Sequence, residues 1–219
     1  MRFERNDPGY ERIATFDIET THWDASRGEL VSIGLALHDR GTPIAEAEFQ
    51  LLHRTPTRDE ATLIQDAYEW LDNVEADVLV SFNGRDFDFP FCRERLQLLG
   101  DAVDSPAIHT PDTHLDLFYD DRKDLADQRG EKWPGLEDVI ESYGETVDTQ
   151  MWRGEPLDNA RFGEELGPAV LKAIENDDQR AHDQLLQTVE EYLQDDLEKN
   201  LRIYYYDIGE LTPPVTSSK

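Results

Sequence analysis

The chain has 219 residues, of which 49 are acidic and 21 are basic, so its formal net charge is −28. Hydrophobic residues make up 38% of the chain and aromatic residues 10%, enough for a buried core, which excludes an intrinsically disordered protein. The length fits one compact α/β domain, and the single cysteine, Cys92, excludes intramolecular disulfides and a cysteine-based zinc cluster.

The first predicted element is a strand over residues 11–18, and two acidic residues, Asp17 and Glu19, stand at its end. Because side chains alternate along a strand, both carboxylates lie on the same face. Adjacent carboxylates repel each other, and a bound cation relieves that repulsion. The pair therefore predicts a site for Mg²⁺ or Mn²⁺, which prefer oxygen ligands. In so acidic a chain such pairs also arise by chance, and Asp196 and Glu198 form a second one.

Three more strands and a helix are predicted next along the chain. Alternating and apolar runs predict strands over residues 30–38 and 44–52. Apolar residues at helical spacing predict a helix that Thr57 caps and that ends at Leu71. A short apolar run over residues 77–82 then predicts a buried fourth strand.

The second acidic group follows this fourth strand and contains Asp86 and Asp88. Asn83 and the glycine after it favour a sharp turn, and a proline two residues after Asp88 suits the first turn of a helix predicted over residues 89–99. Asp88 thus falls near a helix start and near the strand end that carries Asp17. Either aspartate can alternatively serve only as a helix cap, accepting hydrogen bonds from free backbone N–H groups.

The rest of the chain is predicted to add one strand, within residues 108–117, and then helices. The helices span residues 136–143, 160–176 and 179–205. The last one carries Tyr192 and Asp196, which are four positions apart and so share a face of the helix. In a chain with eight tyrosines and many aspartates, chance alone accounts for about one such pair. The order of elements indicates an α/β fold with a mixed five-stranded sheet flanked by helices.

Taken in order, three motifs resemble those of the DEDD-superfamily exonucleases, tyrosine subtype. They are Phe16-Asp17-Ile18-Glu19-Thr20, Phe82-Asn83-Gly84-x-x-Phe87-Asp88-x-Pro90 and Tyr192-x-x-x-Asp196. From residue 11 to about residue 200, the chain is similar to the proofreading domain of family B DNA polymerases and its stand-alone relatives. The resemblance implies a single ribonuclease H-like domain over residues 1–211, and we expect a disordered tail at 212–219.

The resemblance also implies an activity, a metal-dependent 3′→5′ exonuclease that releases nucleoside monophosphates. Two divalent cations, Mg²⁺ or Mn²⁺, about 3.5–4 Å apart would be held by four carboxylates, those of Asp17, Glu19, Asp88 and Asp196. Tyr192 would orient the attacking water. The terminal nucleotide would be contacted by Thr20, Asn83 and Phe87. Family B enzymes often have a tyrosine where this chain has Phe82, so the substrate-contacting hydroxyl of that tyrosine has no counterpart here.

The substrate and two alternatives stay open at this point. Nucleic acid with a single-stranded 3′ end is the expected partner, and single-stranded DNA is favoured. The carboxylates do not distinguish deoxyribose from ribose, so an RNA 3′-end-trimming enzyme of the same superfamily is one alternative. The other is a non-catalytic ribonuclease H-like module that binds nucleic acid or a protein. Such a module would be expected to lack one or more of the four acids, all of which are present here.

The basic residues comprise 16 arginines and only 5 lysines. An acidic, lysine-poor composition resembles that of proteins from extreme halophiles, such as halophilic archaea. Molar salt shortens the Debye length to about 3 Å, which makes the self-repulsion of such a chain tolerable. Because the sequence has neither an N-terminal secretion signal nor an apolar span of membrane length, we expect a soluble cytoplasmic protein without a membrane partner.

Overall fold

The computed structural model describes residues 1–211, and the tail expected at 212–219 lies outside the described residues. Its centre is a mixed five-stranded sheet in the order β3-β2-β1-β4-β5. The strands are β1 (Arg12–Thr20), β2 (Leu30–Asp39), β3 (Glu48–His53), β4 (Val78–Ser81) and β5 (His114–Asp116). The first three pair antiparallel, whereas β4 and β5 run parallel to β1. The sheet predicted from the sequence is therefore confirmed.

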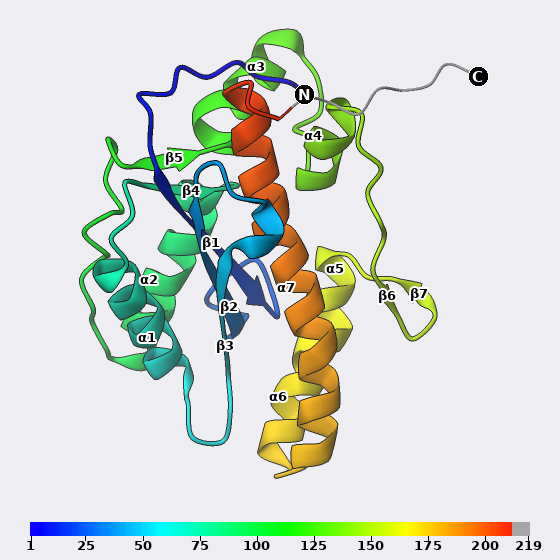
Figure 1. The fold of residues 1–219 in the computed structure, drawn as a ribbon. Coiled ribbons are helices and arrows are strands. Elements are labelled where there is room, and N and C mark those ends of the chain that lie inside the picture. The colour runs from blue at the N-terminus through cyan, green and yellow to red at the C-terminus, as the bar shows by residue number, and fades with distance from the viewer. Residues whose placement is uncertain (212–219) are drawn as a thin grey trace.

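Helices cover both faces of this sheet (Figure 1). The two helices on one face are α1 (Glu60–Asn73) and α2 (Phe89–Leu99). The long helix α7 (Gln179–Asp207) crosses the opposite face. The shorter helices are α3 (Asp124–Arg129), α4 (Leu136–Ser142), α5 (Asn159–Arg161) and α6 (Gly167–Glu175). In Figure 1, α5 and α6 lie beside α7, and contacts between α4 and α7 place α4 there as well.

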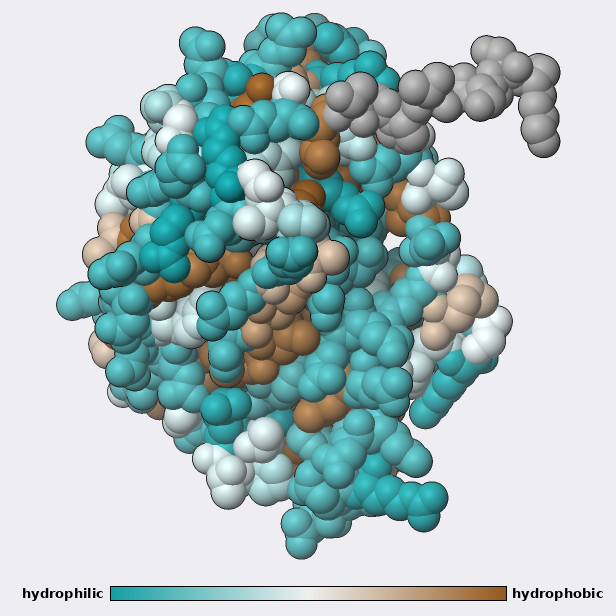
Figure 2. Space-filling view, viewed as in Figure 1, coloured by the Kyte–Doolittle hydropathy of each residue, from teal (hydrophilic) through white to brown (hydrophobic). Residues whose placement is uncertain are grey.

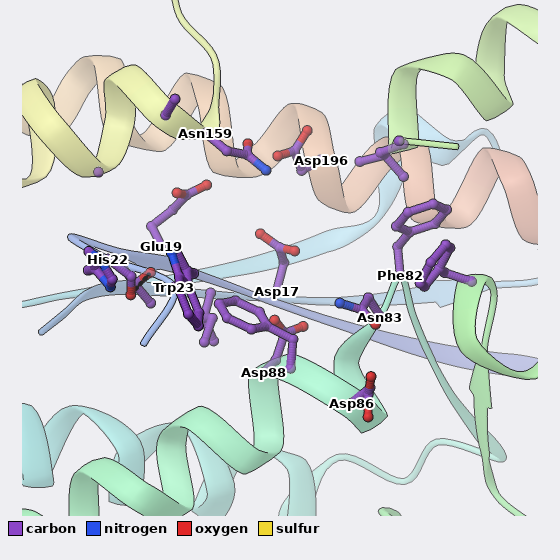
Figure 3. Close-up of a pocket in the computed structure, with 18 of the residues that line it drawn as sticks. Asp17, Glu19, His22, Trp23, Phe82, Asn83, Asp86, Asp88, Asn159 and Asp196 are labelled. Atoms are coloured by element: carbon purple, nitrogen blue, oxygen red, sulfur yellow. Dashed lines mark hydrogen bonds between the residues drawn. The ribbon is translucent and has the colours of Figure 1, made fainter. Parts of the chain in front are cut away.

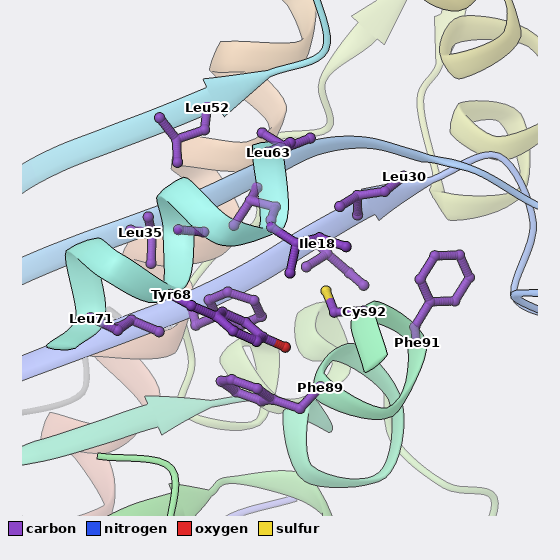
Figure 4. Packing of buried hydrophobic residues seen from close by; sticks show 14 of the residues in the cluster. Ile18, Leu30, Leu35, Leu52, Leu63, Tyr68, Leu71, Phe89, Phe91 and Cys92 are labelled. Atoms are coloured by element: carbon purple, nitrogen blue, oxygen red, sulfur yellow. The ribbon is translucent and has the colours of Figure 1, made fainter. Parts of the chain in front are cut away.

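The alternation of side chains along β1 assigns each of its faces to a different core. Phe16 and Ile18 pack with α1 and α2, where the ring of Phe16 stacks on that of Phe89 with centroids 4.6 Å apart. Figure 4 shows this cluster, in which Cys92 is fully buried. Ile13, on the other face, packs with α7. Burying each large apolar side chain contributes about 1.5–3 kcal/mol, so α7 is held firmly on the sheet.

Two expected boundaries are wrong. Helix α1 is capped by Asp59, whose carboxylate accepts a hydrogen bond of 2.8 Å from the backbone N–H of Thr62. Thr57 lies instead in a turn that backbone hydrogen bonds close. Strand β3 starts at Glu48 because Ile44–Glu46 forms a short 3-10 turn before it.

Three features have no counterpart in the sequence prediction. A π-helical turn (Phe118–Lys123) and helix α3 follow β5, and a small hairpin joins β6 (Met151–Trp152) to β7 (Glu155–Pro156). The helix expected over residues 160–176 is divided, because a π-helical turn separates α5 from α6. In contrast, α2 has the bounds predicted for it and ends at Gly100, which adopts the left-handed conformation.

Candidate functional site

Strand β1 and helix α7 bring three carboxylates together. Asp17 and Glu19 point toward α7, since they alternate with the core residues Phe16 and Ile18. One carboxylate oxygen from each of Asp17, Glu19 and Asp196 lies within 4.8 Å of the others (Figure 3). This spacing and ligand type suit a hard divalent cation.

The approach of α7 to this part of the sheet depends on a glycine. Gly34 on β2 is the cross-strand partner of Asp17. A Cβ atom at Gly34 would lie 2.7 Å from Cγ of Leu193 and 2.9 Å from Cδ1 of Leu197. The missing side chain therefore lets α7 pack closely enough to carry Asp196 to the end of β1.

A fourth carboxylate comes from the turn after β4. Asn83 has a φ of 70°, in the left-handed region, and a π-helical turn (Gly84–Asp88) follows it. A Cβ atom at Gly84 would lie 2.8 Å from Cβ of Ser81 and 3.2 Å from Oδ2 of Asp88, so only glycine fits this turn. The turn brings Asp88 back to the cavity that Asp17 and Asp196 line.

The same turn is anchored by Asp116 at the end of β5. Its carboxylate accepts hydrogen bonds of 2.9 Å from the backbone N–H groups of Asn83 and Arg85. It also accepts bonds from the backbone N–H groups of Phe118 and Tyr119. One buried carboxylate thus fixes the loops after both β4 and β5.

The helix-cap interpretation does not hold for Asp88. Its side chain makes no cap hydrogen bond to α2, and its buried Oδ2 has no hydrogen-bond partner among the described residues. Leaving a buried acceptor without a partner costs about 1–3 kcal/mol, a penalty that a bound cation would remove. Asp86 differs, because its side chain is 53% exposed and pairs with Nζ of Lys123 at 3.2 Å.

Burial and mutual repulsion act together on these acids. Burial raises the pKa of Asp17 well above its ordinary value, and the charge of Asp196 raises it further. Burial followed by the charge of Asp17 likewise raises the pKa of Glu19 and that of Asp88. Burial raises the pKa of Asp196 to about 6 although Lys199 opposes the shift. Without a bound cation this repulsion favours the protonated forms of the acids, and a divalent metal would favour their charged forms instead, so the residues fit such an ion.

A buried lysine supplies part of the compensating charge. Nζ of Lys199 lies 3.0 Å from an oxygen of Asp196, 3.0 Å from Glu137 and 2.8 Å from Asp195. Burial disfavours its charged form, but these three carboxylates raise its pKa, so the ammonium group stays charged. Asp195 pairs with this lysine and is not part of the carboxylate cluster. The pairing of Lys199 with Glu137 could not be predicted from the sequence, because it depends on how α4 packs against α7.

Tyr192 lies one helical turn before Asp196 and is buried. Its hydroxyl donates a hydrogen bond of 2.5 Å to Oδ1 of Asn159, at the start of α5. Burial raises the pKa of Tyr192, as do the charges of Glu19 and Asp196, so its hydroxyl remains protonated. No sequence pattern predicted a role for Asn159, which is 33 residues away from Tyr192 in the chain.

The acidic cluster opens into a cavity of about 660 Å³. The cavity is lined by residues from all three motifs, including the proposed nucleotide contacts Thr20, Asn83 and Phe87. Trp23, beside His22, also lines it, as Figure 3 shows. Of the described lining residues, seven are acidic and none is lysine or arginine. The cavity thus attracts cations and repels anions.

None of the described helices combines the length and the apolar character needed to cross a membrane.

Comparisons with known proteins agree with this fold. The structure is similar to that of the family B DNA polymerase from the hyperthermophilic archaeon Pyrobaculum calidifontis, with a TM-score of 0.60 and 18% identity. The match covers 94% of this chain and 25% of the polymerase, so the chain spans about a quarter of that protein's length, and at this identity the likeness shows the fold alone. No curated protein matches the sequence. A family model of the RNase H superfamily matches residues 14–153, and the expected ribonuclease H-like fold is confirmed: this chain belongs to the RNase H superfamily.

Proposed function

We propose that this protein is a metal-dependent 3′→5′ exonuclease that hydrolyses the phosphodiester bonds of nucleic acid and releases nucleoside monophosphates, with single-stranded DNA as the favoured substrate. The observation that carries the proposal is the convergence of four carboxylates in one open cavity, three of them buried and that of Asp17 partly buried. They come from three separate segments, namely β1, the turn after β4 and α7. The RNase H superfamily fold supports a nuclease, and Tyr192 beside Asp196 supports the tyrosine exonuclease subtype.

The four carboxylates would hold two Mg²⁺ or Mn²⁺ ions. When bound, such a pair supplies a hydroxide at neutral pH and stabilises the charge on the leaving 3′ oxygen. Deprotonated carboxylates are required for this, and Lys199 favours the charged form of Asp196 by donating a hydrogen bond of 3.0 Å to it.

Tyr192 would orient the attacking water. Its only proton is donated to Asn159, so the lone pairs of its oxygen are free to accept a hydrogen bond from water. Asn159, which itself lines the cavity, then acts as a positioning residue, because it fixes the direction of the Tyr192 hydroxyl. Holding a water molecule in line in this way lowers the entropic part of the barrier.

Three residues of the cavity are proposed to contact the terminal nucleotide. Oδ1 of Asn83 is buried without a hydrogen-bond partner among the described residues and is therefore available to a ligand. Phe87 offers an aromatic ring for the base, and it lines the cavity together with Thr20.

Two alternatives are separated by direct tests. A binding module without catalysis has no use for four mutually repelling carboxylates gathered in one cavity, and their presence favours the enzyme. To choose between DNA and RNA, 5′-labelled single-stranded oligonucleotides of each kind should be incubated with Mg²⁺ or Mn²⁺ in molar KCl. We expect a ladder that shortens from the 3′ end and stops in chelator. Cleavage inside the strand, or full activity in excess chelator, would overturn the proposal.

A further inference from the structure

An exposed tryptophan stands at the edge of the carboxylate cavity. Trp133 lies in the loop between α3 and α4 and lines the same cavity as Asp17 and Asp196. Its side chain is 49% exposed, so the indole is accessible from the cavity. Trp133 has no part in the roles proposed above for the four carboxylates and Tyr192.

This indole is held in a fixed orientation despite its exposure. Its Nε1 donates a hydrogen bond of 2.8 Å to Oδ1 of Asp127. The indole and the ring of Phe118 meet in a T-shaped contact at 71° with centroids 5.9 Å apart, and Phe118 in turn packs on Phe82 at 5.5 Å. Nζ of Lys123 lies 5.1 Å from the centre of the indole. Phe82, Phe118 and Trp133 thus form a continuous aromatic wall, and all three line the cavity.

The charge of the cavity restricts what this wall can bind. A polyanion cannot rely on phosphate contacts to lysine or arginine here, because the described lining residues include neither. It can bind through phosphate at bound cations and through its bases, which stack on aromatic rings whatever their sequence. Stacking also persists in concentrated salt, whereas contacts made by releasing counterions do not. A fixed indole face beside an acidic metal centre therefore suits a nucleobase.

We propose that Trp133 is a stacking platform for one base of a single-stranded polynucleotide whose 3′ end lies at the carboxylate cluster. The inference rests on the proposed function for the position of the 3′ end. It adds a binding residue outside all three sequence motifs. Because the hydrogen bond to Asp127 and the contact with Phe118 fix the indole beforehand, the ring loses little conformational freedom when a base stacks on it.

The test is a binding measurement, made with Ca²⁺ in place of Mg²⁺ and with gel analysis to verify that the strand stays intact. Fluorescence anisotropy would follow 5′-labelled eight-residue oligonucleotides of DNA and of RNA in molar KCl. Trp133→Ala should bind about 5- to 100-fold more weakly, as expected for the loss of one stacked base, and Trp133→Phe should retain most of the affinity. Tyr119→Ala is a matched control, because Tyr119 is exposed and contacts the same Lys123 but does not line the cavity.

A second series replaces single nucleotides near the 3′ end with abasic ones. In the wild-type protein, an abasic nucleotide at one position should weaken binding by the same factor as the Trp133→Ala substitution. In the Trp133→Ala variant, an abasic nucleotide at the same position should not weaken binding further. The inference would be overturned if Trp133→Ala kept the wild-type affinity or if Tyr119→Ala lost as much affinity as Trp133→Ala. It would also be overturned if the losses from Trp133→Ala and from the abasic position added up, or if neither oligonucleotide bound. If the wild type shows the position-specific loss but never cleaves with Mg²⁺ or Mn²⁺, the exonuclease proposal fails and the platform stands. If the wild type cleaves with Mg²⁺ or Mn²⁺ but Trp133→Ala binds normally, the platform fails and the exonuclease proposal stands.

Discussion

Asp86 and Asp88 are two residues apart in sequence but lie in opposite environments. Asp88 is buried with an unpartnered oxygen among the described residues, whereas Asp86 is exposed and pairs with Lys123. We expect Asp88→Asn to lower kcat by at least about 100-fold, since it removes a carboxylate that we propose to be a metal ligand worth several kcal/mol. Asp86→Asn should remain largely active. Steady-state kinetics of both variants checks this, and equal losses would show that Asp88 has no special role.

The raised pKa of Asp196 predicts how stability depends on pH in chelator. The ordinary pKa is 3.8, and burial raises it to about 6 in the folded chain. Between these values the folded state keeps a proton that the unfolded state releases, so this residue's contribution to stability is lost as pH rises through the interval. Asp196→Asn lacks this titration, and its melting temperature should fall less over the same range. Thermal unfolding in chelator at constant ionic strength measures both slopes, and identical slopes would be inconsistent with the buried carboxylate described above.

Tyr192 offers a substitution that removes one hydroxyl and little else. Tyr192→Phe keeps the stacking on Phe162, whose ring centroid is 5.8 Å away, so the melting temperature should hardly change. Turnover should fall at least about tenfold, the scale of a lost water-positioning group. Asn159→Ala, which leaves the hydroxyl present but unguided, should reduce kcat less and leave KM unchanged. Wild-type turnover in Tyr192→Phe would mean that the tyrosine only packs α7 against α5 and α6.

At the scale of elements, the turn between β4 and α2 controls where Asp88 points. Gly84→Ala places a Cβ against Ser81 and Asp88, so the turn must shift, at a cost of about 1–3 kcal/mol. We expect it to lose both stability and cleavage. Gly100→Ala is the control, because this glycine has a φ of 78° but nothing within 4 Å of its missing Cβ. It should be destabilised by about 1 kcal/mol and remain active once folded. Parallel urea unfolding and activity measurements separate the two effects, and an active Gly84→Ala would refute the role of the turn.

Elements with strong local signals could be predicted from the sequence. The period-two pattern of β1 placed Asp17 and Glu19 on one face, and Gly100 marked the end of α2. The segment from Phe118 to Arg129 was missed because its π-helical turn and short polar helix leave no apolar period. Contacts between distant segments were missed for a different reason. Those of Lys199 with Glu137, and of Tyr192 with Asn159, arise only when α4 and α5 pack beside α7, and no local pattern encodes that packing.

At the scale of the whole molecule, the charge of −28 repels itself, and we expect the fold to become more stable when salt screens this repulsion. Hydrophilic residues predominate on the face seen in Figure 2, with smaller hydrophobic areas between them. Molar KCl shortens the range of their repulsion to about 3 Å. Both melting temperature and exonuclease rate should therefore rise with KCl up to molar concentration, since there are few phosphate contacts to lose. Calorimetry and activity across a salt series provide the check. A protein that is most stable and most active at about 0.1 M KCl would leave a halophilic adaptation without support.

The most direct test of the metal centre is a count of bound Mn²⁺ by electron paramagnetic resonance titration in molar KCl. If the four carboxylates hold two metal ions as proposed, the wild type and Asp86→Asn should each bind two Mn²⁺ ions per chain. Asp17→Asn should lose at least one of them, because Asp17 neighbours both Asp196 and Asp88. No specific Mn²⁺ binding by the wild type, or the same count in Asp17→Asn, would contradict the proposed catalytic centre.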